Sequence, residues 1–249
     1  MTFNKDKIIE NDQPPVDYPW METRGTNVNA IWGYIADGLF TSQDEIDDHA
    51  KQFGTVHVGD IKYRDLNDDG VIDDYDKTVI GRGDVPRIYY GFGADLQVGN
   101  FSFSALFQGN AQADRYLDGI SIKPFWDDEG RDNVFANITD RWSADNPTNQ
   151  DVFYPRLSVG SDGNNNNVKP SSWWVKDVSF LRLKQVNISY TLPKKWTDPL
   201  LIKNAQIYLM GTNLLTFSKF KLWDPELNTS NGTAYPNVSS YSIGLKFNF

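Results

Sequence analysis

The last ten residues of the chain constrain its fold more than any other segment. From Ser240 to Phe249, apolar residues alternate with small or polar ones. Successive side chains of a β-strand point to opposite sides, so this pattern predicts a strand with one apolar and one polar face. The apolar face consists of Tyr241, Ile243, Leu245, Phe247 and Phe249.

Four further segments follow the same period of two, and the five together predict an all-β chain. In one of them, Phe101 and Phe103 oppose Ser102 and Ser104. In another, the apolar positions switch from odd to even numbers near Lys184, which predicts a β-bulge. The predicted strands span about 88–98, 100–110, 174–192, 204–215 and 238–249.

The connections between these strands differ greatly in length. Gly99-Asn100 predicts a tight hairpin, and only about a dozen residues follow Pro193 before the next strand. The segments 111–172 and 218–236 are long, polar and rich in Asn, Asp and Gly. Short periplasmic turns and long extracellular loops are typical of outer-membrane barrels, and every long loop lies outside if the C-terminus is periplasmic. We therefore predict an antiparallel transmembrane β-barrel segment, with lipid of the outer membrane against its apolar face.

A soluble protein with two stacked sheets would also show alternating strands. The alternative is therefore a secreted, calcium-stabilised, carbohydrate-binding β-sandwich. The unequal loops and the strand length of about ten residues, which suits a tilted crossing of a bilayer, favour the barrel.

Composition excludes several classes of function. The net charge of −9 argues against a nucleic-acid partner, since such binding needs a clustered basic face. The absence of cysteine removes thiolate nucleophiles and Cys-ligated zinc. Neither G-x-S-x-G nor H-E-x-x-H occurs, so we predict no catalytic residues and no enzyme.

Residues 65–76, DLNDDGVIDDYD, have the spacing of an EF-hand-like calcium loop. Gly70 falls where such a loop turns sharply, and Ile72 falls where it turns an apolar side chain inward. Calcium prefers about six to eight hard oxygen ligands, which this spacing would bring to one point. We expect a structural Ca²⁺ site here, within an extracellular loop region over 1–87; an acidic turn without metal is the alternative. The predicted ligands are Asp65, Asn67, Asp69, the Val71 carbonyl, Asp73 and Asp76.

Aromatic residues in the long loops are weaker candidates for ligand contact. Trp126, Trp142 and Tyr154 could stack against sugar rings. Packing within the loops or at the membrane interface is the more common use of such residues.

Three stretches in this order resemble the C-terminal part of SusC/RagA family TonB-dependent transporters of Bacteroidetes. They are IWGYIADGLFTSQDEID at 31–47, the block from GDIKYRDLNDDGVIDDYDKTVIG at 59–81 to YYGFGADLQVGNFSFSALFQG at 89–109, and YPNVSSYSIGLKFNF at 235–249. The resemblance implies a Gram-negative outer-membrane location, a barrel of about 22 strands, a SusD-like lipoprotein partner, and import of an oligosaccharide or peptide substrate energised by TonB. It also implies that the alternating residues ending in Phe249 form a signal for the barrel-assembly machinery.

The chain departs from the family pattern at its N-terminal side. It shows no secretory signal, plug or TonB-contacting segment, and it holds only a few of the barrel strands. We therefore expect TonB to act through an N-terminal part that is missing here, and we do not expect this chain to transport alone.

Overall fold

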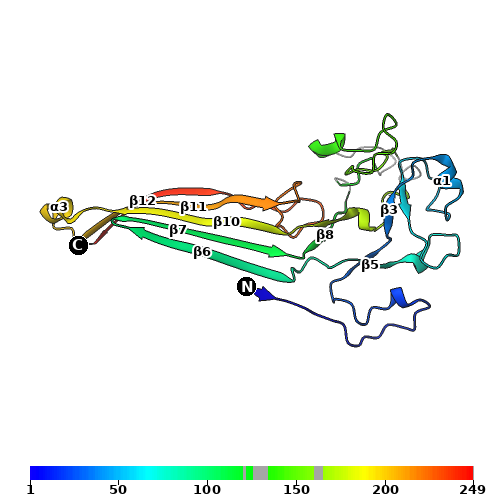
Figure 1. The fold of residues 1–249 in the computed structure, drawn as a ribbon, viewed down its shortest axis with the longest axis horizontal. Helices are drawn as coiled ribbons and strands as arrows, with labels where there is room; N and C mark the ends of the chain where they lie inside the picture. Colours follow the sequence, from blue (N-terminus) through cyan, green and yellow to red (C-terminus); the bar gives the residue numbers. More distant parts are fainter. Residues whose placement is uncertain (120–121, 126–133, 160–164, 249) are drawn as a thin grey trace.

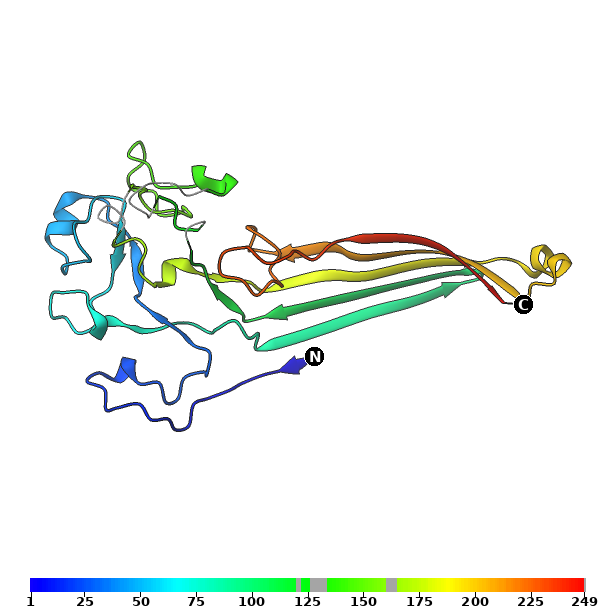
Figure 2. The same cartoon turned by 180° about the vertical axis from the view of Figure 1, so that it is seen from behind.

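The computed structural model of the chain describes residues 1–119, 122–125, 134–159 and 165–248. Five long strands form one elongated sheet, and a cluster of loops and short elements lies at one end of it (Figure 1). The hairpin turn and the short helix α3 lie at the other end, where the C-terminus also lies; the reverse view shows the same arrangement (Figure 2). Among the described residues, no helix is long and apolar enough to cross a membrane.

The secondary structure is almost entirely β, as predicted. The strands are β1 (Thr2–Phe3), β2 (Ile31–Gly33), β3 (Ala36–Leu39), β4 (Ile61–Tyr63), β5 (Thr78–Gly81), β6 (Ile88–Val98), β7 (Phe101–Ala111), β8 (Asp114–Tyr116), β9 (Val175–Asp177), β10 (Phe180–Thr191), β11 (Asn204–Ser218) and β12 (Ser240–Asn248). The helices are α1 (Gln43–Asp47) and α3 (Lys194–Thr197), with 3-10 turns η1 (Pro19–Met21), η2 (Asp74–Asp76), η3 (Ala136–Thr139), η4 (Ser172–Trp174) and η5 (Asp198–Leu200).

The main sheet has the order β1-β6-β7-β10-β11-β12, and all of its pairs are antiparallel. Gly99, with a φ of 59°, makes the tight β6–β7 turn, because glycine enters this left-handed region at low cost. The register of β10 shifts between Leu183 and Gln185 against both neighbours, which confirms the predicted bulge. In β11 the shift falls at Asn213, whose φ of 52° is also left-handed.

Cross-strand register gives the sheet one apolar face and one polar face, because paired residues point to the same side. One apolar row across five strands is Leu96, Phe103, Ile188, Leu209 and Ile243. The adjacent row on the other face is Asp95, Ser104, Asn187, Met210 and Ser242. Tyr241 and Ile243 are 78% and 75% exposed, so no described element covers the apolar face. The second sheet that a β-sandwich requires on this face is not among the described residues.

The hydrophobic core lies in the loop cluster rather than on the sheet. Residues far apart in sequence meet there because the long loops fold back on each other. Tyr34 pairs with Ser171 in an isolated bridge, and the Ala36 amide donates to the Ser172 hydroxyl at 2.9 Å. The buried apolar residues of this core are Tyr34, Leu39, Ile61, Tyr63, Ile72, Ala113, Leu117, Ile122, Tyr154, Trp174, Val178 and Phe220.

Several predicted boundaries need correction. The predicted strand at 174–192 is two strands, β9 and β10, because β9 leaves the main sheet to pair with β8. The predicted strand at 204–215 continues to Ser218, and the long segment 111–172 contains β8 and η3. At the N-terminus, β1 adds a short edge to β6 that the alternation did not indicate.

Candidate functional site: an acidic loop and a polar groove

The acidic loop at 65–76 folds around its own backbone amides. Asp65 accepts hydrogen bonds from the amides of Asp68 and Gly70, both at 2.8 Å, and Asp69 accepts one from Val71 at 2.9 Å. Gly70 adopts a φ of 84°, as the sharp turn at this position requires. Ile72 is buried, as its position in the loop predicted.

Asp76 is the most enclosed carboxylate of this loop, with no exposed surface. It accepts hydrogen bonds from the amides of Leu66 at 2.7 Å and Asp73 at 2.8 Å. Burial raises the pKa of its carboxyl; the two amide donors lower it, and the charges of Asp65 and Asp73 raise it further. Negative charge therefore accumulates around a buried carboxylate.

In the described part of the chain, side chains do not converge on one point as they do around a bound metal ion. No three His, Cys, Asp or Glu side chains there are grouped as metal ligands. The other predicted donors are the Asn67 carboxamide and the Val71 carbonyl, and Asn67 instead donates to Asp69 at 2.8 Å. Calcium binding by this loop stays a prediction.

The three candidate loop aromatics differ in burial and in contacts. Tyr154 is fully buried beside Phe153 and Trp174, so ligand contact is not open to its ring, and it has the more common use expected of the loop aromatics, packing within the loops. Trp142 is half-buried and donates its indole N–H to the Pro147 carbonyl at 3.0 Å. Trp126 lies outside the described residues.

The predicted assembly signal lies on the apolar face of β12. Tyr241, Ile243, Leu245 and Phe247 are all exposed there, while Phe249 lies outside the described residues. Exposure of these side chains fits either lipid contact or recognition by another protein.

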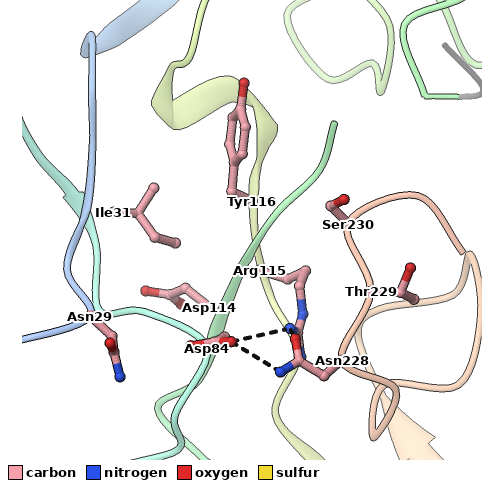
Figure 3. A pocket seen from close by; sticks show the side chains of 9 residues that line it. All are labelled: Asn29, Ile31, Asp84, Asp114, Arg115, Tyr116, Asn228, Thr229 and Ser230. Atoms are coloured by element: carbon pink, nitrogen blue, oxygen red, sulfur yellow. Dashed lines mark hydrogen bonds and ion pairs between the residues drawn. The ribbon is translucent and has the colours of Figure 1, made fainter. Parts of the chain in front are cut away.

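A polar groove lies where the loop cluster meets the sheet, and its central residues are Asp84, Arg115 and Asn228. The Arg115 guanidinium hydrogen-bonds to the Asn228 carboxamide oxygen, and Asn228 donates to Asp84 at 3.1 Å (Figure 3). These three residues line two adjacent cavities, of about 520 and 360 Å³. The first cavity is otherwise lined by Asn29, Ile31, Asp114, Tyr116, Thr229 and Ser230, and Figure 3 shows this arrangement.

The charges of the groove are largely compensated within it. Asp114 accepts two hydrogen bonds from the Arg82 side chain, at 3.0 and 2.8 Å. Arg115 lies 3.8 Å from Asp84, beyond hydrogen-bonding distance. Burial lowers the pKa of the Arg115 guanidinium, and the Asp84 charge raises it.

Sequence reasoning missed this groove. Arg115 and Asn228 are separated by 113 positions, and neither lies in a motif that predicts a contact between them. The only local signal was the polar character of the segments that follow the long strands.

Comparison of this chain with known proteins shows which proteins it resembles in sequence and in fold. No family model matches the chain. The TonB-dependent receptor P26 of Formosa agariphila is 34% identical over 237 residues, which cover 90% of this chain and 23% of that receptor. The chain is a homologue of TonB-dependent receptors. The TonB-dependent receptor P3 of the same organism is 27% identical over 238 residues, covering 90% of this chain and 22% of the relative.

Solved structures share the fold of this TonB-dependent receptor homologue. The RagAB peptide importer in the closed-closed state aligns with a TM-score of 0.65 at 21% identity, over 91% of this chain and 23% of that one. The open-open state aligns with the same TM-score over 100% of this chain and 25% of that one. The homologue thus spans less than a quarter of the curated relatives' length. Its curated relatives are named as TonB-dependent receptors, and the solved structures as a peptide importer.

Proposed function

We propose that the chain contributes barrel-wall strands and extracellular loops to a TonB-dependent outer-membrane importer of glycans or peptides. The observation that carries this proposal is the exposed apolar face of a sheet whose other face is polar. A membrane barrel needs this distribution, because lipid covers its outside and its interior is polar. The homology to TonB-dependent receptors supports the same conclusion.

Orientation follows from the two ends of the sheet. The large folded loops lie at one end, and the short connections and the end of β12 lie at the other (Figure 1). Long loops of such barrels are extracellular, so we place the loop cluster outside and the C-terminus in the periplasm. β1 and β12 are the edges of the sheet and would pair with further strands of the closed barrel.

A SusD-like lipoprotein is the proposed partner on the extracellular side. Its support is the fold shared with the RagAB importer and the packed core of the loop cluster, which offers a rigid surface. The barrel-assembly machinery is proposed to recognise β12 through the residues Tyr241 to Phe249. TonB would act through a part of the receptor other than this chain.

Calcium is the proposed structural ion of the 65–76 loop. The buried Asp76 carboxylate with Asp65 and Asp73 nearby is the feature that supports it, because a divalent cation would offset this negative charge. When bound, the ion would be held by the six predicted oxygen donors and would brace the loop without taking part in chemistry.

Uptake by living cells tests the proposed function. Native cells are given a mixed pool of oligosaccharides and peptides, and depletion from the medium is followed by mass spectrometry. We expect one set of compounds to be depleted only when both the receptor gene and TonB are intact. Depletion that is unaffected by deletion of the receptor gene would contradict the proposal.

A further inference from the structure

A cavity separate from the Arg115 groove lies just beyond the apolar face of the main sheet. The last apolar row before the loops, set by the register of β6, β7, β10 and β11, is Tyr90, Gly109, Leu181 and Phe217. Strand β11 ends one residue after this row, at the loop end of the sheet (Figure 1). The residues that follow it, 219–222, line a cavity of about 460 Å³ together with parts of β9 and the 134–159 loop.

The exposure of residues 217–221 shows on which side of the chain the lysines of this cavity lie. Phe217 is 56% exposed on the apolar face, whereas Phe220 is 7% exposed in the core of the loop cluster. Lys219 and Lys221, on either side of Phe220, are exposed. The alternation of β11 thus continues past its end, and both lysines lie on the side of Phe217. That side faces lipid in the proposed barrel, so the two lysines lie at the level of the outer-leaflet headgroups.

The polar lining of this cavity carries a positive net charge. Its three ammonium groups and two carboxylates belong to Lys176, Lys219, Lys221, Asp140 and Asp177. Lys176 is half-buried, with its Nζ 5.1 Å from the centre of the Phe153 ring. Burial lowers the pKa of the Lys176 ammonium, and the charge of Asp140 raises it. Asp177 lies 3.6 Å from the Arg82 guanidinium, so its charge is shared with a cation outside the cavity.

The carboxylates that follow the cavity in sequence do not neutralise its lysines. Asp224 and Glu226 both pair with Arg182, on the polar face of the sheet. Among the residues that the structure describes, neither Lys219 nor Lys221 forms an ion pair. Two exposed ammonium groups are therefore open to an anionic ligand.

We propose that this cavity binds a phosphate group on the headgroup of an outer-leaflet glycolipid. The inference rests on the proposed function, because lipid must lie against the apolar face. Lysine binds phosphate as a point charge, and exposed lysines are attracted to anionic lipid surfaces. A solute in transit passes through the barrel interior, whereas Lys219 and Lys221 lie on the lipid side. The position of the cavity thus favours a lipid over a dissolved anion as the source of the phosphate.

Binding measurements on the receptor at its full natural length test the site. The receptor is purified in detergent and titrated, with detection by native mass spectrometry, with bisphosphorylated lipid A, dephosphorylated lipid A and phosphatidylglycerol. We expect the phosphorylated glycolipid to bind most tightly. Removal of its phosphates, or Lys219→Gln with Lys221→Gln, should weaken binding about ten- to thirty-fold. Inorganic phosphate at the same concentration should not displace it.

A matched variant controls for non-specific attraction between lysines and lipid. Lys194→Gln with Lys195→Gln removes the same charge from exposed positions of α3, at the opposite end of the sheet. We expect this double variant to bind the phosphorylated glycolipid as the unaltered receptor does. The comparison of lipids on the unaltered receptor tests the phosphate contact independently of any effect of substitution on folding.

Several results would overturn this site. Equal binding of the phosphorylated and dephosphorylated lipids, or no binding of either, would show that the cavity does not recognise the phosphate. Equal binding by the two double variants would place the lipid elsewhere. Displacement by inorganic phosphate would make this a site for the free anion, and tighter binding of phosphatidylglycerol would replace the glycolipid.

Failure of the proposed function has a different signature. A receptor that binds the phosphorylated lipid through Lys219 and Lys221 but depletes nothing from the medium would refute the importer and not the cavity. Uptake that depends on the receptor, without any phosphate-dependent lipid binding, would refute the cavity alone.

Discussion

At the residue scale, the acidic loop is distinguished by the buried carboxylate of Asp76. A buried carboxylate is normally paired with a cation or neutralised by a proton. Asp76 has two amide donors and two nearby carboxylates, which leaves net negative charge around it. We therefore expect Ca²⁺ to bind the purified receptor and to raise its melting temperature, since binding to the folded state alone stabilises it.

Paired substitutions test that calcium prediction. Asp65→Ala with Asp69→Ala should abolish saturable binding in a calcium titration followed by terbium luminescence. Asp145→Ala with Asp151→Ala removes the same charge from another exposed loop and should leave binding intact. Equal titration curves for the two double variants would show that the loop is an acidic turn without metal.

Residue roles could be predicted only where a local pattern fixes them. The spacing of residues 65–76 placed Ile72 in the core correctly, because position within a tight loop sets the direction of a side chain. The burial of Tyr154 depends on Trp174, which lies 20 positions away on a separate turn. No periodicity reports such a contact, so the sequence left two uses open for Tyr154, and the Arg115 groove was missed for the same reason.

At the scale of the elements, alternation predicted the long strands well. A period of two is a property of the strand itself, so β6 has the predicted bounds and β7 differs by one residue at each end. The choice of partner strand depends on distant residues, so alternation does not report it. This is why the pairing of β9 with β8, in place of a continuous strand with β10, was not predicted.

Placing a charge on each face of β12 in turn tests whether one face contacts lipid and the other does not. Ile243→Lys places an ammonium group on the apolar face, where it should cost about 2–4 kcal/mol if lipid lies there. Ser242→Lys places the same group on the polar face, and we expect little loss. The measurement is the urea midpoint for folding of the receptor into liposomes. Equal midpoints for the two variants would contradict a lipid-facing apolar row.

At the scale of the whole molecule, the sheet and the loop cluster are stabilised in different ways. The loop cluster has a packed hydrophobic core and ion pairs to buried carboxylates, such as Arg156 with Asp60 at 2.8 Å. The sheet has a continuous hydrogen-bonded ladder, and its apolar side chains are exposed. An exposed apolar face of this size is expected to be covered, and the cover that we propose is the lipid of the outer membrane.

The most direct test of this account is the environment of two adjacent residues on β11. The chain has no cysteine, so single spin labels can be attached at Leu209→Cys and Met210→Cys in a cysteine-free receptor in liposomes. Paramagnetic relaxation compares collision with oxygen, which concentrates in lipid, and with a water-soluble nickel chelate. We predict a label at 209 that meets oxygen and not nickel, and a label at 210 with no such preference for oxygen. A label at 209 that nickel reaches as readily as oxygen would contradict the membrane-spanning wall.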